Sequence, residues 1–237
     1  MLAAPAADPA PLGRSDPSAA SCGASALRLV AVEAIVGLGL TDWTGAAEAV
    51  ATAGWCRLAG ALPAPVVEEL IASMPGPWHE LPEEEGNAGV RQAGFACWTS
   101  LESAAAPVRD LATEVTACLT AARPDGVAAV PPFNEAQWTL YPRGAGHITA
   151  HRDPLGVGGV IAIATLTGRA RFFIGGRAEP RRAEWETGVG DLVLLRGNGW
   201  PEAGLPRPMH GVEPPADGER IILTFRHNRG GAGASYF

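Results

Sequence analysis

The second half of the chain is a series of short apolar runs, each interrupted by glycine or proline. Such runs have the length of single strands, and their Val, Ile, Leu and Phe content favours a sheet. Several are too continuously apolar to be half exposed, which indicates that both of their faces are buried. The runs are FNEAQWTLY, HITAH, GGVIAIATL, ARFFI, DLVLLRG and RIILTFRHN, all after residue 130. This pattern predicts a closed or sandwiched antiparallel sheet.

Helical patterns precede these strands. The predicted helices cover residues 41–55, 62–74 and 103–126. Thr41 or Asp42 can cap the first helix, and Pro65 suits the first turn of the second. The third has apolar residues every three or four positions and ends in a Pro-Asp-Gly stop. We expect these helices to pack on the outside of the sheet.

The N-terminal segment and the cysteines indicate in which cellular compartment we expect the protein. Residues 1–25 are rich in Ala, Pro and Ser without apolar periodicity, so we expect a disordered tail. The apolar run 29–40 is too short to span a membrane and contains Glu33. The four cysteines are far apart and form no Cys-x-x-Cys pair. These features predict a cytoplasmic protein with no membrane attachment.

The charge of the chain disfavours nucleic acid as a partner. The net charge is −7, and all 18 basic residues are arginine. Nucleic-acid affinity depends mainly on cations that displace counterions from phosphates. However, 12 of the arginines lie after residue 130, against 10 acids there, so this half is slightly basic. Some of these arginines are suited to anionic small molecules.

A candidate metal site lies in HITAHRD, residues 147–153. A single His-x-Asp pair such as His151 and Asp153 is weak evidence, because it arises readily by chance. On a strand, however, both side chains and those of His147 and Thr149 would project to one face. His210, in RPMHGVEPP, is the candidate third ligand. Two imidazoles and one carboxylate are the facial triad of non-haem Fe(II) oxygenases, which leaves His147 as a neighbour.

Two arginines on the last strand complete the pattern. Arg220 and Arg226 in RIILTFR lie an even number of residues apart, so both side chains point to one face. A guanidinium aimed into a barrel is costly without an anionic partner, and its fork fits a carboxylate. A dicarboxylate co-substrate would be such a partner.

The order of these motifs resembles the Fe(II)/2-oxoglutarate-dependent oxygenases, and among them the AlkB-like branch. The motifs are YPRG, HRD, GDLVLLRG, HGVEP and RIILTFR, within residues 131–230. The resemblance implies a mainly β (α+β) chain with a double-stranded β-helix, a jelly-roll or cupin-like barrel, and N-terminal supporting helices. It implies one oxygenase domain over 26–237, in which 26–130 gives helical support and a candidate substrate lid and 131–230 forms the β-helix core.

The resemblance also implies roles for single residues. Fe(II) would be bound by His151, Asp153 and His210, and the distal carboxylate of 2-oxoglutarate by Arg220. Arg226 matches the second arginine near the co-substrate, and Tyr141 matches a tyrosine that hydrogen-bonds it. Thr139 stands where the AlkB pattern usually has Asn, and Ile222 where it usually has a polar residue.

The implied reaction consumes 2-oxoglutarate and O2, hydroxylates a C–H bond of a small-molecule substrate and decarboxylates 2-oxoglutarate to succinate and CO2. The alternative is AlkB-type oxidative demethylation of alkylated nucleobases. A third reading is a barrel that binds a small ligand without iron. Candidate substrate contacts are Arg152, between the two ligands of the His-x-Asp pair, and Trp98, Trp78 and Trp138, although aromatic side chains mostly pack in the core.

Overall fold

The computed structural model describes residues 34–35, 42–85 and 89–231. The predicted tail, residues 1–25, lies outside the described residues. Most of the apolar run 29–40 does so as well, and only its residues Ala34–Ile35 are described, as strand β1. Among the described residues, no helix is both long enough and apolar enough to cross a membrane.

The three predicted helices are confirmed, each shorter than its sequence pattern. They are α1 (Trp43–Thr52), α2 (Ala64–Ala72) and α3 (Ala106–Ala121). Asp42 caps α1, because its Oδ1 accepts a hydrogen bond of 2.9 Å from the backbone N–H of Gly45. The other two helices begin with a proline in the first turn instead of a side-chain cap.

The strands form two sheets. The eight-stranded sheet has the order β1, β2 (Trp55–Ala59), β12 (Leu192–Arg196), β9 (Val157–Thr167), β14 (Arg220–Asn228), β7 (Glu135–Tyr141), β6 (Phe95–Ser100), β3 (His79–Glu80). The six-stranded sheet has the order β11 (Arg181–Thr187), β10 (Ala170–Gly175), β13 (His210–Val212), β8 (His147–His151), β5 (Val90–Ala93), β4 (Glu84–Glu85).

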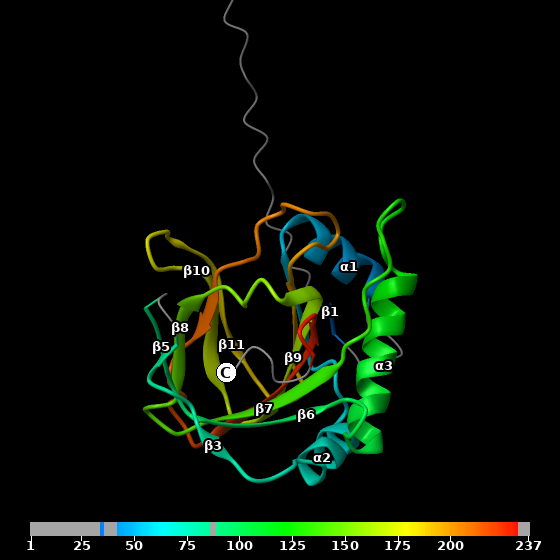
Figure 1. Cartoon of the computed structure of the whole chain (residues 1–237). Coiled ribbons are helices and arrows are strands. Elements are labelled where there is room, and N and C mark those ends of the chain that lie inside the picture. Colours follow the sequence, from blue (N-terminus) through cyan, green and yellow to red (C-terminus); the bar gives the residue numbers. More distant parts are fainter. Residues whose placement is uncertain (1–33, 36–41, 86–88, 232–237) are drawn as a thin grey trace, which may run out of the picture.

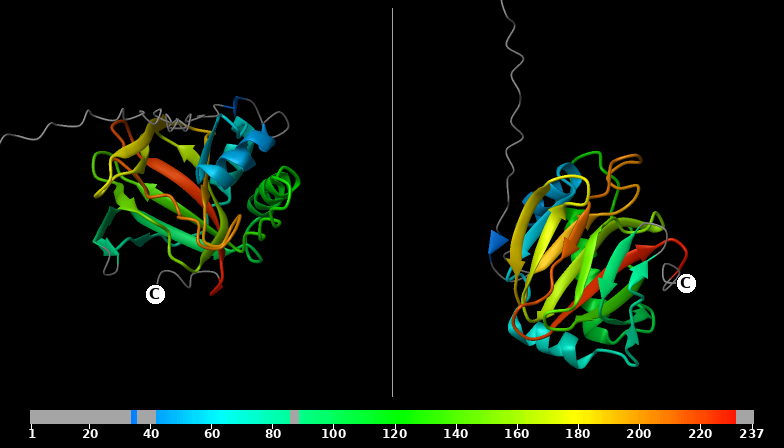
Figure 2. Two further views of the ribbon diagram at one scale, coloured as in Figure 1. Left: turned by 90° about the horizontal axis from the view of Figure 1, so that it is seen from above. Right: turned by 90° about the vertical axis from the view of Figure 1, so that its left-hand side faces the viewer.

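From β7 onward the chain passes from one sheet to the other at nearly every connection. Strands β8, β10, β11 and β13 lie in the small sheet, whereas β7, β9, β12 and β14 lie in the large one. All pairs in this part are antiparallel. The two sheets face each other in Figures 1 and 2. This arrangement is the predicted double-stranded β-helix.

The position of β9 in the interior of the large sheet explains why its sequence is continuously apolar. Val160, Ala162 and Ala164 lie in the core between the large sheet and the helices. Ile161 and Ile163 face the other way, into the core between the two sheets. Because both faces are buried, period-two alternation of polar and apolar residues disappears. Figure 2 shows α1 and α3 on the outer side of the large sheet.

Two tryptophans join the sheets at one open side. Trp55 on β2 and Trp185 on β11 stack with ring centroids 5.1 Å apart and an interplanar angle of 17°. Phe172 on β10 packs on Trp185 with centroids 5.3 Å apart. Strand β2, which lies next to the edge strand β1, and β11, the edge strand of the small sheet, are thus held together by aromatic contact, since β2 and β11 do not pair with each other through their backbones.

Strands also occur where the sequence did not predict them. β5 and β6 lie in the stretch 75–102, and β2 follows the first helix. β6 pairs with β7 along its whole length, from Phe95 opposite Leu140 to Ser100 opposite Glu135. Backbone pairing needs no particular side-chain pattern, so VRQA and FACWTS carry little sequence signal. The segment 26–130, expected to give helical support and a candidate substrate lid, therefore also contributes strands to both sheets.

Candidate active site

His151 and His210 are brought together by strand pairing. His151 ends β8 and lies directly opposite His210 on β13. Their ring centroids are 4.3 Å apart. Two residues that are far apart in the sequence therefore become neighbours through the hydrogen-bond register of the small sheet.

A β-bulge in β8 decides which way His151 points. His210 pairs with His151, and Val212 pairs with Ile148, so three steps along β8 match two steps along β13. As a result Ile148 and His151 both line one cavity, although regular alternation would put them on opposite faces. His147 does not line this cavity. The expectation that His147, Thr149 and His151 share one face was therefore wrong, because the extra residue shifts the alternation.

Gly211, next to His210, permits this close packing. A Cβ atom at this position would lie 2.4 Å from Cζ of Phe173 and 2.8 Å from the carbonyl oxygen of Ile148. Both distances are far below van der Waals contact. Glycine is therefore the residue that lets β13 approach β8 and β10 closely enough to place His210 opposite His151.

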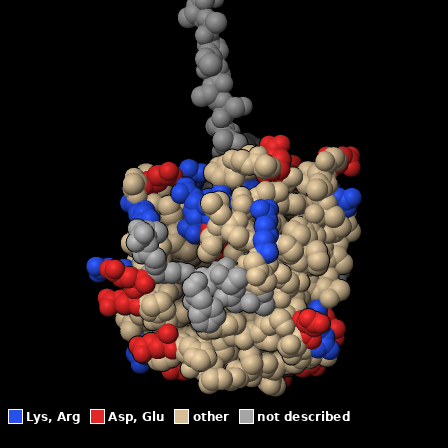
Figure 3. Space-filling model, viewed as in Figure 1, with Lys and Arg blue, Asp and Glu red and all other residues tan. Residues whose placement is uncertain are grey.

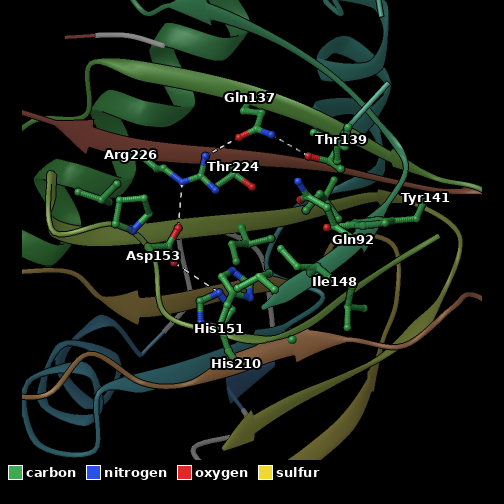
Figure 4. A pocket seen from close by; sticks show the side chains of 18 of the residues that line it. Gln92, Gln137, Thr139, Tyr141, Ile148, His151, Asp153, His210, Thr224 and Arg226 are labelled. Atoms are coloured by element: carbon green, nitrogen blue, oxygen red, sulfur yellow. Dashed lines mark hydrogen bonds and ion pairs between the residues drawn. The ribbon is translucent and has the colours of Figure 1, made fainter. Parts of the chain in front are cut away.

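Asp153 completes the cluster from the loop after β8. Its Oδ2 lies 3.4 Å from Nε2 of His210. One ligand atom from each of His151, Asp153 and His210 lies within 4.8 Å of the others, which is the separation of groups that share a metal ion. Figure 4 shows the three side chains pointing toward one another. This is the His-x-Asp and distant His arrangement predicted from the sequence.

Both histidines present Nε2 as a ligand atom. Nδ1 of His151 lies 3.0 Å from the carbonyl oxygen of Thr149, and Nδ1 of His210 lies 3.2 Å from that of Pro208. A carbonyl oxygen can only accept, so the proton is on Nδ1 and the lone pair is on Nε2. Burial lowers the pKa of His210 to about 4. The ring is therefore neutral near pH 7, as metal ligation requires.

Asp153 is held as a carboxylate by the cations around it. Burial alone would raise its pKa, but Arg226 and then His210 and His151 outweigh burial and lower that pKa below its ordinary value. The largest of these contributions comes from Arg226, whose Nε lies 3.3 Å from Oδ1 of Asp153. Arg226 also donates to Gln137 and lies 3.8 Å from the buried Glu135. Arg226 thus binds the candidate iron ligand itself.

Arg220 is the buried cation with unused donors. Its side chain is 1% exposed, and its Nη2 donates to Oγ1 of Thr165 at 3.1 Å and of Thr187 at 3.0 Å. Nε and Nη1 have no hydrogen-bond acceptor in the described part of the chain. Burial lowers the pKa of Arg220 to about 10, so the guanidinium remains charged at pH 7. Two unused donors on a buried cation fit the carboxylate of a dicarboxylate such as 2-oxoglutarate.

Tyr141 and Thr139 lie beside this arginine. Tyr141 is paired with Arg220 across β7 and β14, and the guanidinium carbon is 5.8 Å from the tyrosine ring centroid. Burial raises the pKa of Tyr141, so the phenol keeps its proton and can donate it in a hydrogen bond. Oγ1 of Thr139 accepts from Nε2 of Gln137 at 3.3 Å. Both predicted residues line the cavity.

Gln137, Thr224 and Gln92 are cavity residues that the sequence analysis missed. Gln137 and Thr224 are polar residues within apolar strands, at positions two residues from Thr139 and Arg226 respectively. This period-two spacing was a usable signal. Gln92 lies on β5, which the sequence did not predict, so no signal indicated it. Figure 4 shows all three facing the same space.

The cavity has a volume of about 910 Å³, which is within the range of small-molecule sites. Its inner wall is apolar and surrounds the polar groups. This wall is formed by Ile148, Val157, Ile163, Phe172, Val212 and Ile222. The segment from His79 to Glu84 borders the cavity where the edge strands β3 and β4 lie.

The predicted substrate contacts divide into two groups. Trp98 and Arg152 line the cavity, and the ring centroid of Trp98 is 5.4 Å from that of His79. Trp138 is fully buried in the core that faces the helices, on the opposite face of β7, and Trp78 packs against the same core. The structure therefore does not bring Trp138 or Trp78 to the cavity, because strand alternation and helix packing direct them outward.

Comparison with known proteins finds similarity at the level of structure. No protein-family model matches the chain, and no curated protein matches it in sequence. A prolyl-4-hydroxylase from Pseudomonas putida superposes with a TM-score of 0.55 and 24% identity, covering 79% of this chain and 99% of that one.

Two further structures superpose equally well. A prolyl hydroxylase from Trichoplax adhaerens, in complex with a hypoxia-inducible-factor peptide fragment, has a TM-score of 0.56 and 13% identity, covering 79% and 90% of the two chains. An oxidoreductase of the 2OG-Fe(II) oxygenase family from Burkholderia pseudomallei has a TM-score of 0.56 and 12% identity, covering 81% and 94%. The chain therefore has the double-stranded β-helix fold of the 2-oxoglutarate- and Fe(II)-dependent oxygenases, with a His-Asp-His cluster inside it.

Proposed function

We propose that the protein is a non-haem Fe(II)/2-oxoglutarate-dependent dioxygenase that hydroxylates a C–H bond of a small molecule. One observation carries this proposal. A single cavity contains a cluster of two imidazoles and one carboxylate, of which Asp153 and His210 are buried and His151 is half-buried, and also a buried arginine with two unused donors. The first fits Fe(II) and the second fits the co-substrate.

The residues of the chain have separate tasks in this proposal. Nε2 of His151, Nε2 of His210 and the carboxylate of Asp153 would hold Fe(II), and Arg226 would keep that carboxylate ionised and oriented. The guanidinium of Arg220 would hold the distal carboxylate of 2-oxoglutarate. When bound, iron, 2-oxoglutarate and O2 would supply an oxidation that decarboxylates 2-oxoglutarate to succinate and CO2, with one oxygen atom of O2 entering succinate and the other entering the C–H bond of the substrate.

The apolar wall would protect this reaction from water. Ile148, Phe172 and Val212 lie beside the cluster and offer no hydrogen-bonding group to solvent. Excluding water strengthens the ionic contacts of Arg220 and Asp153 inside the cavity. Because Asp153 supplies a carboxylate ligand, a halide would find no vacated position, and hydroxylation is the expected outcome.

A small-molecule substrate fits the charge of the protein better than nucleic acid does. The net charge is −7, and Glu80 and Glu84 are among the residues that line the cavity on the edge strands. Carboxylates at the mouth repel phosphates. AlkB-type demethylation of alkylated nucleobases is the second candidate, favoured only by the order of the sequence motifs from YPRG to LTFR.

Conversion of 2-oxoglutarate to succinate tests the site. The Fe(II)-loaded protein should form succinate, and His210→Ala should abolish this activity. His147→Ala is the matched control, because His147 lies on β8 but outside the cavity. Full succinate formation by His210→Ala would refute the assignment of the site.

Mass spectrometry of candidate substrates then separates the two reactions. A gain of one oxygen atom in a metabolite supports hydroxylation of a small molecule. Loss of a methyl group from a methylated oligonucleotide supports the demethylase instead, and would contradict the small-molecule proposal.

A further inference from the structure

We propose that Arg152, with Arg207 beside it, binds a carboxylate group of the substrate at the mouth of the cavity. This inference rests on the proposed function, because it assigns the substrate class of the same cavity. The substrate would be a small carboxylic acid that places its anion at Arg152 and its apolar part against the inner wall.

Arg152 occupies a special place in the chain. It lies between the two candidate iron ligands His151 and Asp153, and its side chain is exposed while it also lines the cavity. An anion bound there would be held next to the proposed reaction centre. The charge of Arg152 is therefore placed to orient a substrate and does not belong to a distant part of the surface.

Hydrogen bonds to backbone oxygens fix the two arginines. Nε of Arg152 donates to the carbonyl oxygen of Arg207 at 2.9 Å. Arg207 in turn donates from Nη1 to the carbonyl oxygen of Asp153. These bonds connect the loop after β8 to the loop before β13, and they fix the position of each guanidinium group. The remaining donors of the Arg152 guanidinium have no acceptor within the described segments.

The two guanidinium groups lie close enough for their charges to repel each other. No carboxylate side chain of the described residues lies within 4.0 Å of either group, although exposed arginines such as Arg171 and Arg182 have such partners. A like-charged pair held by carbonyl oxygens is relieved by an anion, and the planar fork of arginine fits a carboxylate with two hydrogen bonds. Figure 3 shows arginine side chains beside a hollow on one face of the molecule.

The rest of the cavity limits the size and type of the anion. Glu80 and Glu84 line the part of the cavity formed by the edge strands, so a polymer with many negative charges would be repelled there. Apolar side chains and the ring of Trp98 line the interior. A single carboxylate on a small apolar or aromatic body satisfies both conditions, whereas a nucleic acid backbone does not.

Matched pairs of acids and amides test this inference. The probes are the N-acetylated proteinogenic amino acids as free acids and as primary amides, which differ in charge but hardly in shape. Binding is measured by ligand-observed NMR on protein loaded with Zn(II), a redox-inert stand-in for iron, and with saturating 2-oxoglutarate. We expect acids among the probes to bind while their amides do not. Arg152→Gln should weaken acid binding about tenfold or more, and Arg207→Gln should weaken it as well.

Arg143→Gln is the matched control. Nε of Arg143 also donates to a backbone carbonyl oxygen, that of Ala216 at 3.1 Å, but this arginine does not line the cavity. Acid binding should be unchanged in this variant. Arg152→Lys keeps the positive charge but loses the planar guanidinium that donates two parallel hydrogen bonds. This variant should bind the acids more weakly than wild type and more tightly than Arg152→Gln.

Three results would overturn the inference. They are equal binding of acids and amides, wild-type binding by Arg152→Gln, and no binding of any acid by the wild-type protein. Zn(II) and 2-oxoglutarate affinities are measured in the same samples. If both remain while acid binding fails, only the carboxylate anchor is refuted. If wild type binds neither Zn(II) nor 2-oxoglutarate, the proposed oxygenase function fails instead.

Discussion

Replacing Arg220 by methionine should separate folding stability from co-substrate binding. Arg220 is 1% exposed, and Nε and Nη1 lack acceptors among the described residues. Leaving buried donors unpaired costs about 1–3 kcal/mol each. Methionine has a similar length and no such donors, so we expect Arg220→Met to be as stable as the ligand-free wild type or more stable. Thr187 keeps a partner, since its hydroxyl also donates to the carbonyl oxygen of Ala170 at 3.0 Å.

Binding of 2-oxoglutarate should change in the opposite direction. A hydrogen bond to a charged group contributes about 1.5–3 kcal/mol, so two bonds from Arg220 to one carboxylate contribute about 3–6 kcal/mol. Their loss corresponds to at least about a hundredfold weaker binding. Arg220→Lys should recover part of this affinity, because it restores the charge without the fork.

Urea unfolding of the Zn(II)-loaded protein with and without 2-oxoglutarate measures both effects. Ligand at a hundred times its dissociation constant should stabilise wild type by about 2.7 kcal/mol. The same concentration should leave Arg220→Met nearly unchanged. A variant that is destabilised by more than about 3 kcal/mol and still stabilised by 2-oxoglutarate would refute the reasoning, because Arg220 would then be a structural residue.

Three further predictions concern the metal, the aromatic stack and pH. Asp153→Ala should bind Fe(II) at least about a hundredfold more weakly in anaerobic titrations, and unchanged affinity would contradict the metal site. Trp185→Ala should lose about 2–3 kcal/mol in urea unfolding, while Val189→Ala, at a residue that is 54% exposed, should change stability by less than about 0.5 kcal/mol; equal effects would refute the role of the stack. Burial lowers the pKa of His210 from 6.5 to about 4, so the unfolded chain takes up the proton first. The metal-free protein should therefore lose stability as pH falls from 6.5 to 4, and His210→Asn should lessen this decline; an unchanged decline would contradict the depressed pKa.

The part of the fold that could be predicted is the part that is buried on both faces. GGVIAIATL on β9 is apolar throughout because one face meets the helices and the other meets the opposite sheet. β11, with the sequence RRAEWET, has one mostly exposed face and lies at the edge of its sheet. Its polar residues therefore form no apolar run from which a strand could be predicted. β5 and β6 depend on backbone pairing with β8 and β7, which lie far along the chain. A local pattern cannot carry that information.

The candidate site was predictable in its residues but not in its geometry. Histidine is rare in this chain, so the pairing of His151 with Asp153 and a distant His210 had few alternatives. The direction of the His151 side chain, however, depends on the bulge opposite β13. Similarly, the even spacing of Arg220 and Arg226 placed them on one face, but only the structure shows that Arg226 contacts the carboxylate of Asp153. These features arise from register, which sequence spacing does not fix.

The charges inside the cavity predict that metal and co-substrate bind cooperatively. Four charged side chains lie around the candidate metal and co-substrate sites: the carboxylate of Asp153, that of the buried Glu135 behind Arg226, and the guanidinium groups of Arg226 and Arg220, so two negative charges face two positive ones when no ligand is bound. Fe(II) alone adds two positive charges and 2-oxoglutarate alone adds two negative charges, whereas both together restore the balance. In a buried site such an imbalance costs several kcal/mol, on the order of 4 kcal/mol for a pair of unit charges about 4 Å apart. Calorimetric titration of 2-oxoglutarate should therefore show at least about tenfold tighter binding with Zn(II) present than without it, and Zn(II) should show the same factor in the reverse titration. Equal affinities in both states would mean that the two ligands do not share this cavity.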